Sequence, residues 1–177
     1  MERISELVAP LGVTSERARD LRAAARAIRT MQLEIDAQDV IVAGELLRLA
    51  PAMMTALDEA GVRWRVPEDI DQARDAPLGV TLAEGAIVET GSVILAEESL
   101  GDRSVGLLSL VNIMLIPVDS IVPSLVEGAT IVRDVAKKGG YATFVTGPSR
   151  SADIEMSLTV GVQGPGRVHY LFVESMR

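Results

Sequence analysis

Residues 39–66 read DVIVAGELLRLAPAMMTALDEAGVRWRV, and the hydrophobic pattern changes twice along them. Asp39 to Ala43 is short, β-branched and bounded by a glycine, which is typical of a buried strand. Glu45 to Ala60 repeats its large apolar residues at helical spacing, and Gly61 follows in the usual position for ending a helix. Val62 to Val66 then alternates between apolar and polar residues, as a strand with one wet face does. This strand–helix–strand unit favours a parallel sheet covered by helices.

Two residues of this unit give more specific predictions. Pro51 has no backbone N–H to donate, so the helix is expected to be irregular there. Trp64 shares its side of the alternating strand with Val62 and Val66. We therefore expect Trp64 to point inward as a core residue rather than to act as an exposed stacking platform.

Upstream, residues 1–38 are predicted to form an N-terminal helical segment. Thr14 or Ser15 is a suitable N-cap, and the apolar residues from Leu21 to Ile35 recur at helical spacing. Arginines between positions 17 and 29 occupy much of the remaining helix surface. They form either a solvated helix side or a basic face for a partner.

Downstream, residues 79–116 contain short apolar runs separated by glycines, which predicts a hairpin or meander of strands. A helix is predicted from Leu125 to Lys138 and a last strand from Val168 to Val173. We therefore expect an α/β fold: an open, largely parallel sheet with helices on both faces and an antiparallel hairpin extension. Residues 1–177 are expected to be a single domain whose core spans residues 39–177.

Composition excludes several classes of protein. The chain has 177 residues, of which 48% are hydrophobic, and a net charge of −8, which argues against a nucleic-acid binder. It has no cysteine, so disulfides, cysteine zinc sites and cysteine-held iron–sulfur clusters are excluded within it. No signal peptide or membrane span is recognisable, and no metal site is expected. These features predict a cytoplasmic protein.

The loop TGPSRSADIE, from Thr146 to Glu155, is predicted to be the centre of the functional site. An apolar strand, Tyr141 to Val145, leads into it, and an amphipathic helix, Ile154 to Val160, is expected to lead out. Free amides at a helix start, with the positive end of the helix dipole, bind anions, and Arg150 can hold a carboxylate or phosphate bidentately. In the simpler alternative, a serine of the loop is only a helix cap and the two acids stabilise the dipole. The ligand-binding residues expected here are Thr146, Gly147, Ser149, Arg150, Ser151 and Asp153.

Glu89 is the candidate catalytic residue. It follows the apolar run 86–88 and precedes Thr90 and Gly91. A carboxylate embedded in such a run has a raised pKa and suits acid, base or nucleophilic work. The alternative, a turn residue at the end of a hairpin, is equally consistent with the sequence. The only histidine, His169, lies in an apolar strand and is expected to be structural.

Several separated motifs carry a family resemblance. They are residues 77–81 (PLGVT), 89–92 (ETGS), Arg103, residues 145–155 (VTGPSRSADIE) and residues 161–165 (GVQGP). In this order they resemble the lactate-utilisation (LUD) domain family of LutC-like proteins. The resemblance runs from about residue 39 to the C-terminus.

The resemblance implies an open α/β fold of the type shared by NagB, ribose-5-phosphate isomerase (RpiA) and CoA transferases. It also implies a part in oxidising lactate to pyruvate beside partner subunits that carry iron–sulfur clusters, with no cofactor in this chain. Two positions depart from the family: Gln163 stands where histidine is usual, and Asn112 lies in a stretch that often contains one. Both can hydrogen-bond but cannot transfer protons as imidazole does. The resemblance adds Thr90, Gly91, Arg103, Gln163 and Gly164 to the ligand-binding residues.

Three functions are consistent with these observations. The first is a LutC-like accessory protein, a non-catalytic subunit that binds a small organic anion and works with iron–sulfur oxidoreductase subunits. The second is an acyl- or CoA-transferase-like enzyme that uses Glu89 as the nucleophile. The third is a non-catalytic, small-molecule-binding regulatory domain. The sequence is also compatible with a homo-oligomer.

Overall fold

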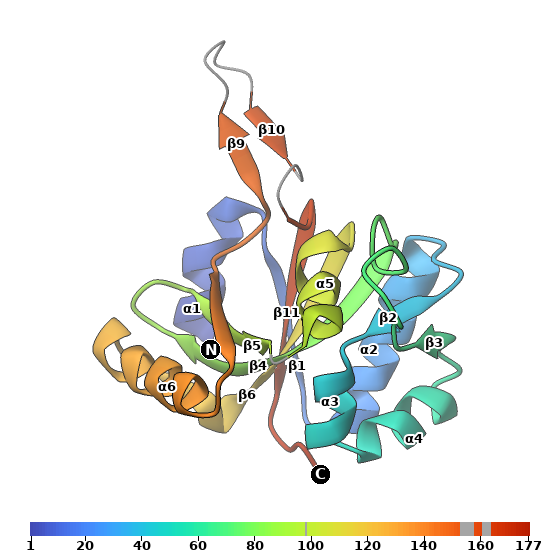
Figure 1. Cartoon of the computed structure of the whole chain (residues 1–177), viewed down its shortest axis with the longest axis horizontal. Helices are drawn as coiled ribbons and strands as arrows, with labels where there is room; N and C mark the ends of the chain where they lie inside the picture. Colours follow the sequence, from blue (N-terminus) through green and yellow to red (C-terminus); the bar gives the residue numbers. More distant parts are fainter. Residues whose placement is uncertain (98, 153–157, 161–163) are drawn as a thin grey trace.

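The structure is a computed structural model and describes residues 1–97, 99–152, 158–160 and 164–177 (Figure 1). Its helices are α1 (Glu2–Val8), α2 (Leu21–Glu34), α3 (Gly44–Leu49), α4 (Ala52–Glu59), α5 (Leu100–Leu108) and α6 (Leu125–Lys137), with the 3-10 turns η1 (Ala9–Leu11) and η2 (Val118–Ser120). Its strands are β1 (Thr14–Ala18), β2 (Val40–Val42), β3 (Trp64–Arg65), β4 (Leu78–Ile87), β5 (Val93–Glu97), β6 (Val111–Pro117), β7 (Ile121–Val122), β8 (Tyr141–Val145), β9 (Arg150–Ala152), β10 (Leu158–Val160) and β11 (Arg167–Val173).

The main sheet is parallel and runs in the order β1-β11-β6-β4-β2-β3. The unit at residues 39–66 lies at one side of it, where β2 pairs with β3 and β4. The chain therefore moves outward from β2 to β3 and then returns to β4 on the other side of β2. The predicted α/β fold with a largely parallel sheet is confirmed.

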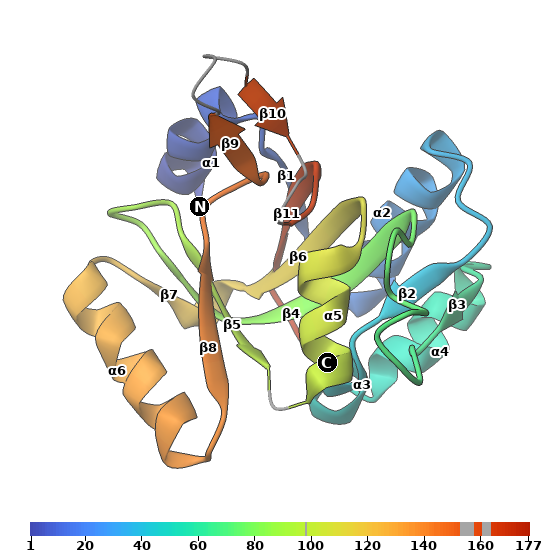
Figure 2. The same ribbon diagram turned by 45° about the horizontal axis from the view of Figure 1, so that its top comes forward.

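An antiparallel extension grows from the far half of β4. Within this ten-residue strand the register shifts between Ala83 and Gly85, where the pairing passes to β5. β5 pairs in turn with β8, so the extension carries the neighbours β4, β5 and β8 side by side. The predicted hairpin extension is confirmed, and it positions the turn of residues 88–92 beside the end of β8 (Figure 2).

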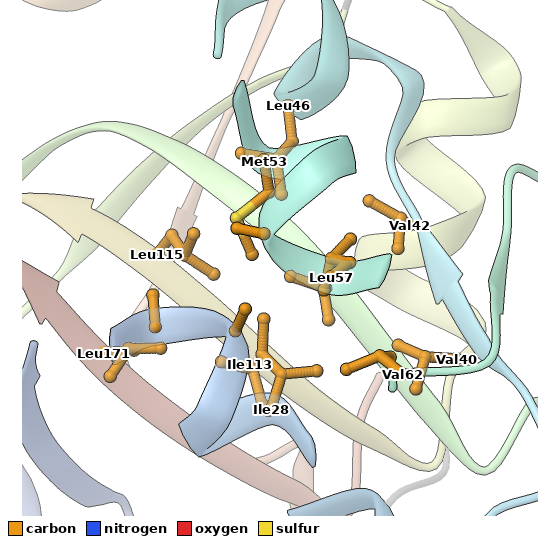
Figure 3. Close-up of a cluster of buried hydrophobic side chains, with 14 of the residues drawn as sticks. Ile28, Val40, Val42, Leu46, Met53, Leu57, Val62, Ile113, Leu115 and Leu171 are labelled. Carbon is orange, nitrogen blue, oxygen red and sulfur yellow. The ribbon is translucent and has the colours of Figure 1, made fainter. Parts of the chain in front are cut away.

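Helices cover both faces of the main sheet, as predicted. On one face α2 and α4 bury Ile28, Met53 and Leu57 against Ile113 and Leu171 of the strands (Figure 3). On the other face α1 buries Ile4 and Val8 against β6 and β11, and α5 covers β2 and β4. Each fully buried aliphatic side chain of this kind stabilises the fold by about 1.5–3 kcal/mol.

The N-terminal segment is not all helical, and here the prediction is wrong. Thr14–Ala18 is a strand that pairs in parallel with residues 169–173 of β11. The helix begins at Leu21 and takes Asp20 as its N-cap, with Asp20 Oδ1 accepting a hydrogen bond from Ala23 N at 2.7 Å. Thr14 and Ser15 looked like caps, but sheet pairing with β11 decides their conformation.

The helix after β2 breaks at Pro51, as predicted, into α3 and α4. Gly61 ends α4 with a φ of 69°. The expectation for Trp64 is only partly correct: its ring packs at the margin of the core, but its Nε1 donates to Asp58 at 2.9 Å and Val66 is 40% exposed. The strand was expected to span five residues, yet only two pair with β2.

Candidate functional site

Two of the predicted loops meet through a chain of hydroxyl groups. The Oγ1 of Thr90 donates to the Oγ of Ser92 at 2.8 Å, and Ser92 Oγ lies 2.8 Å from the Oγ1 of Thr146. Thr90 and Ser92 come from the turn between β4 and β5, whereas Thr146 follows β8. The structure thus brings together Thr90, Gly91 and Thr146, three of the residues named above as ligand-binding candidates.

The buried hydroxyl of Tyr170 contacts the backbone of both loops. It lies 3.2 Å from the carbonyl oxygen of Gly91 and 3.1 Å from that of Val145. Burial raises the pKa of Tyr170, so the hydroxyl stays protonated and acts as a donor. Sequence reasoning missed both Ser92 and Tyr170 as site residues. Two features of the sequence could have identified them. Ser92 directly follows Thr90 and Gly91, and the alternation of side chains along the last strand points Tyr170 into the core.

A third loop adjoins the loop after β8. The backbone N–H of Ser149 donates to the carbonyl oxygen of Pro165 at 2.9 Å, and a Cβ at Gly164 would lie 3.3 Å from Ser149 Cβ. Gly147 has a φ of 127°, a conformation that favours glycine. The structure therefore places Gly147, Ser149 and Gly164, three further ligand-binding candidates, close together. We call the residues Thr90–Ser92, Thr146–Arg150 and Gly164–Pro165 the three-loop cluster.

Arg150 is an exposed member of this cluster at the end of its second loop. Its Nη2 donates to the carbonyl oxygen of Leu11, so the guanidinium sits beside the α1–β1 connection. A Cβ on Gly12 would lie 3.5 Å from the same nitrogen. The Arg150 side chain is exposed. Among the predicted site residues, Arg150 is the cationic residue that lies at the three-loop cluster.

The helix expected from Ile154 to Val160 is wrong at residues 158–160, and residues 154–157 lie outside the described residues. Leu158–Val160 is a strand, β10, that pairs antiparallel with β9, Arg150–Ala152, and the two strands project from the body of the molecule (Figure 1). The β-branched Thr159 and Val160 suit such a pairing. No helix start or helix dipole therefore supports anion binding at residues 158–160. Asp153 and Gln163 lie outside the described residues, and the side chain of Ser151 is not described.

Glu89 is exposed in the turn after β4 rather than embedded in an apolar run. Its Oε2 accepts a hydrogen bond from Leu125 N at 2.9 Å, so it caps the first turn of α6. Ser124, the N-cap residue, donates from its hydroxyl to the Glu127 carboxylate, and this hydrogen bond lowers the pKa of Glu127. These contacts correspond to the alternative in which Glu89 is a hairpin-turn residue.

Arg103 is not brought to the three-loop cluster within the chain. It lies on α5, and its Cζ is 4.4 Å from the centroid of the Tyr141 ring. Tyr141 begins β8, whereas Thr146 follows its last residue, Val145. Since a strand rises about 3.3 Å per residue, the two ends of β8 are about 13 Å apart.

His169 and Asn112 are built into the framework. His169 Nδ1 lies 2.8 Å from Thr14 Oγ1, and burial lowers the pKa of His169 to about 4, so it is neutral near pH 7. Asn112 is fully buried; its Oδ1 accepts from Thr81 at 3.0 Å and its Nδ2 donates to the carbonyl oxygen of Val105 at 3.1 Å. Both therefore join neighbouring elements, as the structural interpretation of His169 predicted.

A second polar cluster lies just after the end of β2, beside the middle of β4. Asp102 is buried there; its Oδ1 accepts from Glu45 N at 3.1 Å and its Oδ2 from Ser99 Oγ at 2.6 Å. Asp102 thereby ties the first turn of α5 to the first turn of α3. Across the described ranges, no group of three histidine or acidic side chains could hold a metal ion, and no helix could cross a membrane.

The model of the LUD domain family matches residues 3–173 of the chain. The chain belongs to the LUD-domain family. This LUD domain is 40% identical over 111 residues to lactate utilization protein C 1 of Bacillus mycoides (strain KBAB4), an alignment that covers 60% of the chain and 47% of the relative. Lactate utilization protein C of Bacillus subtilis (strain 168) is 39% identical over 110 residues, with 60% and 46% covered. The matched region is thus about half the length of these relatives.

A solved structure supports the fold of the LUD domain. The crystal structure of a DUF162-family protein from Deinococcus radiodurans at 1.70 Å resolution superposes with a TM-score of 0.69. The similarity covers 97% of this chain and 94% of that chain at 20% sequence identity. At this level of identity the likeness shows a shared α/β fold and nothing of shared chemistry.

Proposed function

We propose that this LUD domain acts in lactate utilisation as an accessory protein that binds a small organic anion at the three-loop cluster. The similarity to proteins named lactate utilization protein C supports the process. The single observation that supports the site is the 2.8 Å contact between Ser92 and Thr146, which joins two family motifs that are 54 positions apart. Hydroxyl groups held in this way can donate to a carboxylate.

The chemistry of the cluster suits a hydroxy acid or keto acid. Arg150 offers planar N–H donors that match a carboxylate, and the hydroxyl of Ser149 can donate to its oxygens. Thr90 Oγ1, whose own hydrogen goes to Ser92, can accept from a ligand hydroxyl group. Tyr170 acts through Gly91 by holding the turn in place. Binding and orientation are the roles that these residues can perform.

Oxidation of lactate to pyruvate requires a carrier for two electrons. The chain has no cysteine with which to hold an iron–sulfur cluster, and we therefore assign such clusters to partner subunits. Deletion of the gene should slow growth on lactate, and the tagged protein should co-purify with cysteine-rich oxidoreductase subunits. Normal growth on lactate together with purification of the chain alone would rule out this role.

Thermal unfolding with L-lactate or pyruvate tests the site directly. A ligand present at 100 times its Kd stabilises by about 2.7 kcal/mol, which raises the Tm of a domain of this size by about 5–10 °C. Arg150→Ala should abolish the shift, whereas Arg133→Ala, an exposed arginine on α6, should retain it. An equal shift in both variants would place the anion elsewhere.

A further inference from the structure

β8 leaves one edge of the antiparallel extension open. Its five residues pair with β5 without a register shift, from Tyr141 opposite Glu97 to Val145 opposite Val93. No other strand among residues 1–97, 99–152, 158–160 and 164–177 pairs with it. The sequence Tyr-Ala-Thr-Phe-Val contains no charge, no proline and no bulge, which are the features that usually protect an edge strand from further pairing.

The direction of the backbone groups identifies which of them face outward. Ser92 turns its carbonyl towards β4, where it accepts from Ile87 N at 2.8 Å. Since backbone groups alternate along a strand, Val93 and Leu95 turn towards β8, and their partners Val145 and Thr143 turn towards β5. The N–H and C=O groups of Ala142 and Phe144 therefore face the open edge.

We propose that β8 pairs antiparallel with β8 of a second copy of this chain, around a two-fold axis at Thr143. Ala142 and Phe144 lie one residue on either side of Thr143, and each presents one donor and one acceptor. Rotation about this axis places Ala142 of each copy opposite Phe144 of the other, which gives four hydrogen bonds. The edge is thus complementary to itself, as a two-fold interface requires.

The side chains at this edge favour the same partner. Phe144 is 46% exposed and lies on the face covered by α6, because it is directly opposite Ile94, which contacts α6 at Gly128. In the paired arrangement its ring covers the small Ala142 of the second copy. The pairing joins two large aromatic side chains to two small ones and brings no charged residue of β8 into the contact. This complementarity matters because the net charge of −8 on each chain opposes the association of two copies.

The pairing also completes the candidate site, a step that depends on the proposed anion-binding function. Around the Thr143 axis, Val145 of one copy lies opposite Tyr141 of the other. The Arg103 guanidinium that stacks on Tyr141 is thereby brought alongside the Thr146 loop of the neighbouring copy. Arg103, which is separated from the three-loop cluster within one chain, supplies a second cation to that cluster across the interface.

The molecular mass in solution tests the pairing. Sedimentation or light scattering from about 1 to about 100 μM, a range that includes Kd values of the order of 1 μM, should give twice the 18.8 kDa of the chain. Ala142→Pro removes an outward N–H, and Phe144→Lys adds a charge to the edge; both should give monomers with unchanged circular dichroism. Leu33→Lys, at a 63% exposed leucine on α2, should remain a dimer. A monomeric wild type, or a dimer that persists in both edge variants, would overturn the proposal.

Cross-linking tests the register. The chain has no cysteine, so a single introduced thiol reports one position. Residues on the axis form a non-hydrogen-bonded pair with Cα atoms about 4.5 Å apart, which is within the range of a disulfide. Thr143→Cys should therefore oxidise to a covalent dimer, while Leu33→Cys should not. A covalent dimer from Leu33→Cys but not from Thr143→Cys would contradict the β8 pairing.

Ligand titration separates the interface from the shared site. In the dimer, Arg103→Ala should lower the apparent affinity for lactate at least tenfold. This affinity is measured from the lactate concentration at which the Tm rises. A full response in Arg103→Ala, with the response lost in Arg150→Ala, would refute the contribution of Arg103 across the interface. If no ligand shifts the wild type, the proposed anion site fails, while the mass and cross-linking results still decide the pairing.

Discussion

Ser92 and Thr146 join the two halves of the candidate site through a 2.8 Å contact between their hydroxyl oxygens. Ser92 is buried, and Thr90 contacts it from the other side, so the three hydroxyls form one network. Either hydroxyl of the Ser92–Thr146 pair can donate. The network fixes the spacing of the β4–β5 turn and the loop after β8, and in the proposed function that spacing selects the anion.

A double-mutant cycle measures this contact. Ser92→Ala and Thr146→Val should each lower the free energy of unfolding by about 1 kcal/mol, because each leaves one hydroxyl without its partner. The double variant should lose less than the sum, with a coupling of about 0.5–1.5 kcal/mol in urea titrations. Thr30→Ala, an exposed helical hydroxyl, should change stability by less than about 0.5 kcal/mol. Strict additivity of the two site variants would show that the hydroxyls do not interact.

Gly91 and Gly61 form a matched pair for testing the turn. Their φ angles are 71° and 69°, so alanine suffers a similar backbone strain at both. A Cβ at Gly91 would lie 2.6 Å from Val8 Cγ1, whereas nothing lies within 4 Å of a Cβ at Gly61. Gly61→Ala should therefore cost about 1 kcal/mol, and Gly91→Ala about 1–3 kcal/mol more from overpacking.

Chemical denaturation of both alanine variants provides the comparison. Adding Val8→Ala to Gly91→Ala should recover part of the loss, because it removes the methyl groups that clash. Equal losses in Gly91→Ala and Gly61→Ala would mean that α1 does not pack on the turn as the structure shows.

Glu89 should contribute to the stability of α6. Glu89→Ala removes the acceptor for Leu125 N and should cost about 0.5–1 kcal/mol, the low end of the range for a helix cap because the carboxylate is exposed. Glu89→Gln keeps an acceptor oxygen and should cost less. Glu68→Ala, in an exposed loop, should be neutral. If Glu89→Ala and Glu68→Ala are equally stable, Glu89 does not cap α6, and the catalytic alternative would again be open to test.

The parallel sheet could be predicted because its strands and helices satisfy local rules. Residues 40–42 are β-branched and buried, Pro51 interrupts a helix, and Gly61 adopts the positive φ that ends one. The missed helix, α5, contains two glycines in LGDRSVGLL, so its intrinsic propensity is low. It forms because Ser99 Oγ accepts from Asp102 N at 2.9 Å and because Val105 is buried against β2.

Part of the candidate site could also be identified from sequence motifs. Thr90 and Thr146 could be named as candidates because both lie in motifs of one family, and the structure joins them through Ser92. The strand after the loop was mistaken for a helix, because three residues such as Leu158–Val160 satisfy either periodicity and only their pairing with β9 distinguishes them. The contact of Arg103 with Tyr141 depends on the register of β8, which no local pattern specifies.

His169 should make the stability of the fold depend on acid. Burial is the main cause that lowers its pKa from 6.5 to about 4; the Arg167 charge lowers it further, Glu34 raises it, and Glu16 lies 4.0 Å from its Nε2. The unfolded chain binds a proton below pH 6.5, whereas the folded chain resists protonation until about pH 4. Stability is therefore lost as the pH falls between these values, by about 3 kcal/mol in total at 1.36 kcal/mol per pKa unit.

His169→Gln keeps a hydrogen-bonding group near Thr14 but cannot titrate, so urea titrations from pH 7 to pH 4 should show a shallower loss of stability than in the wild type. Identical slopes in the two proteins would show that His169 is already accessible to protons in the folded state.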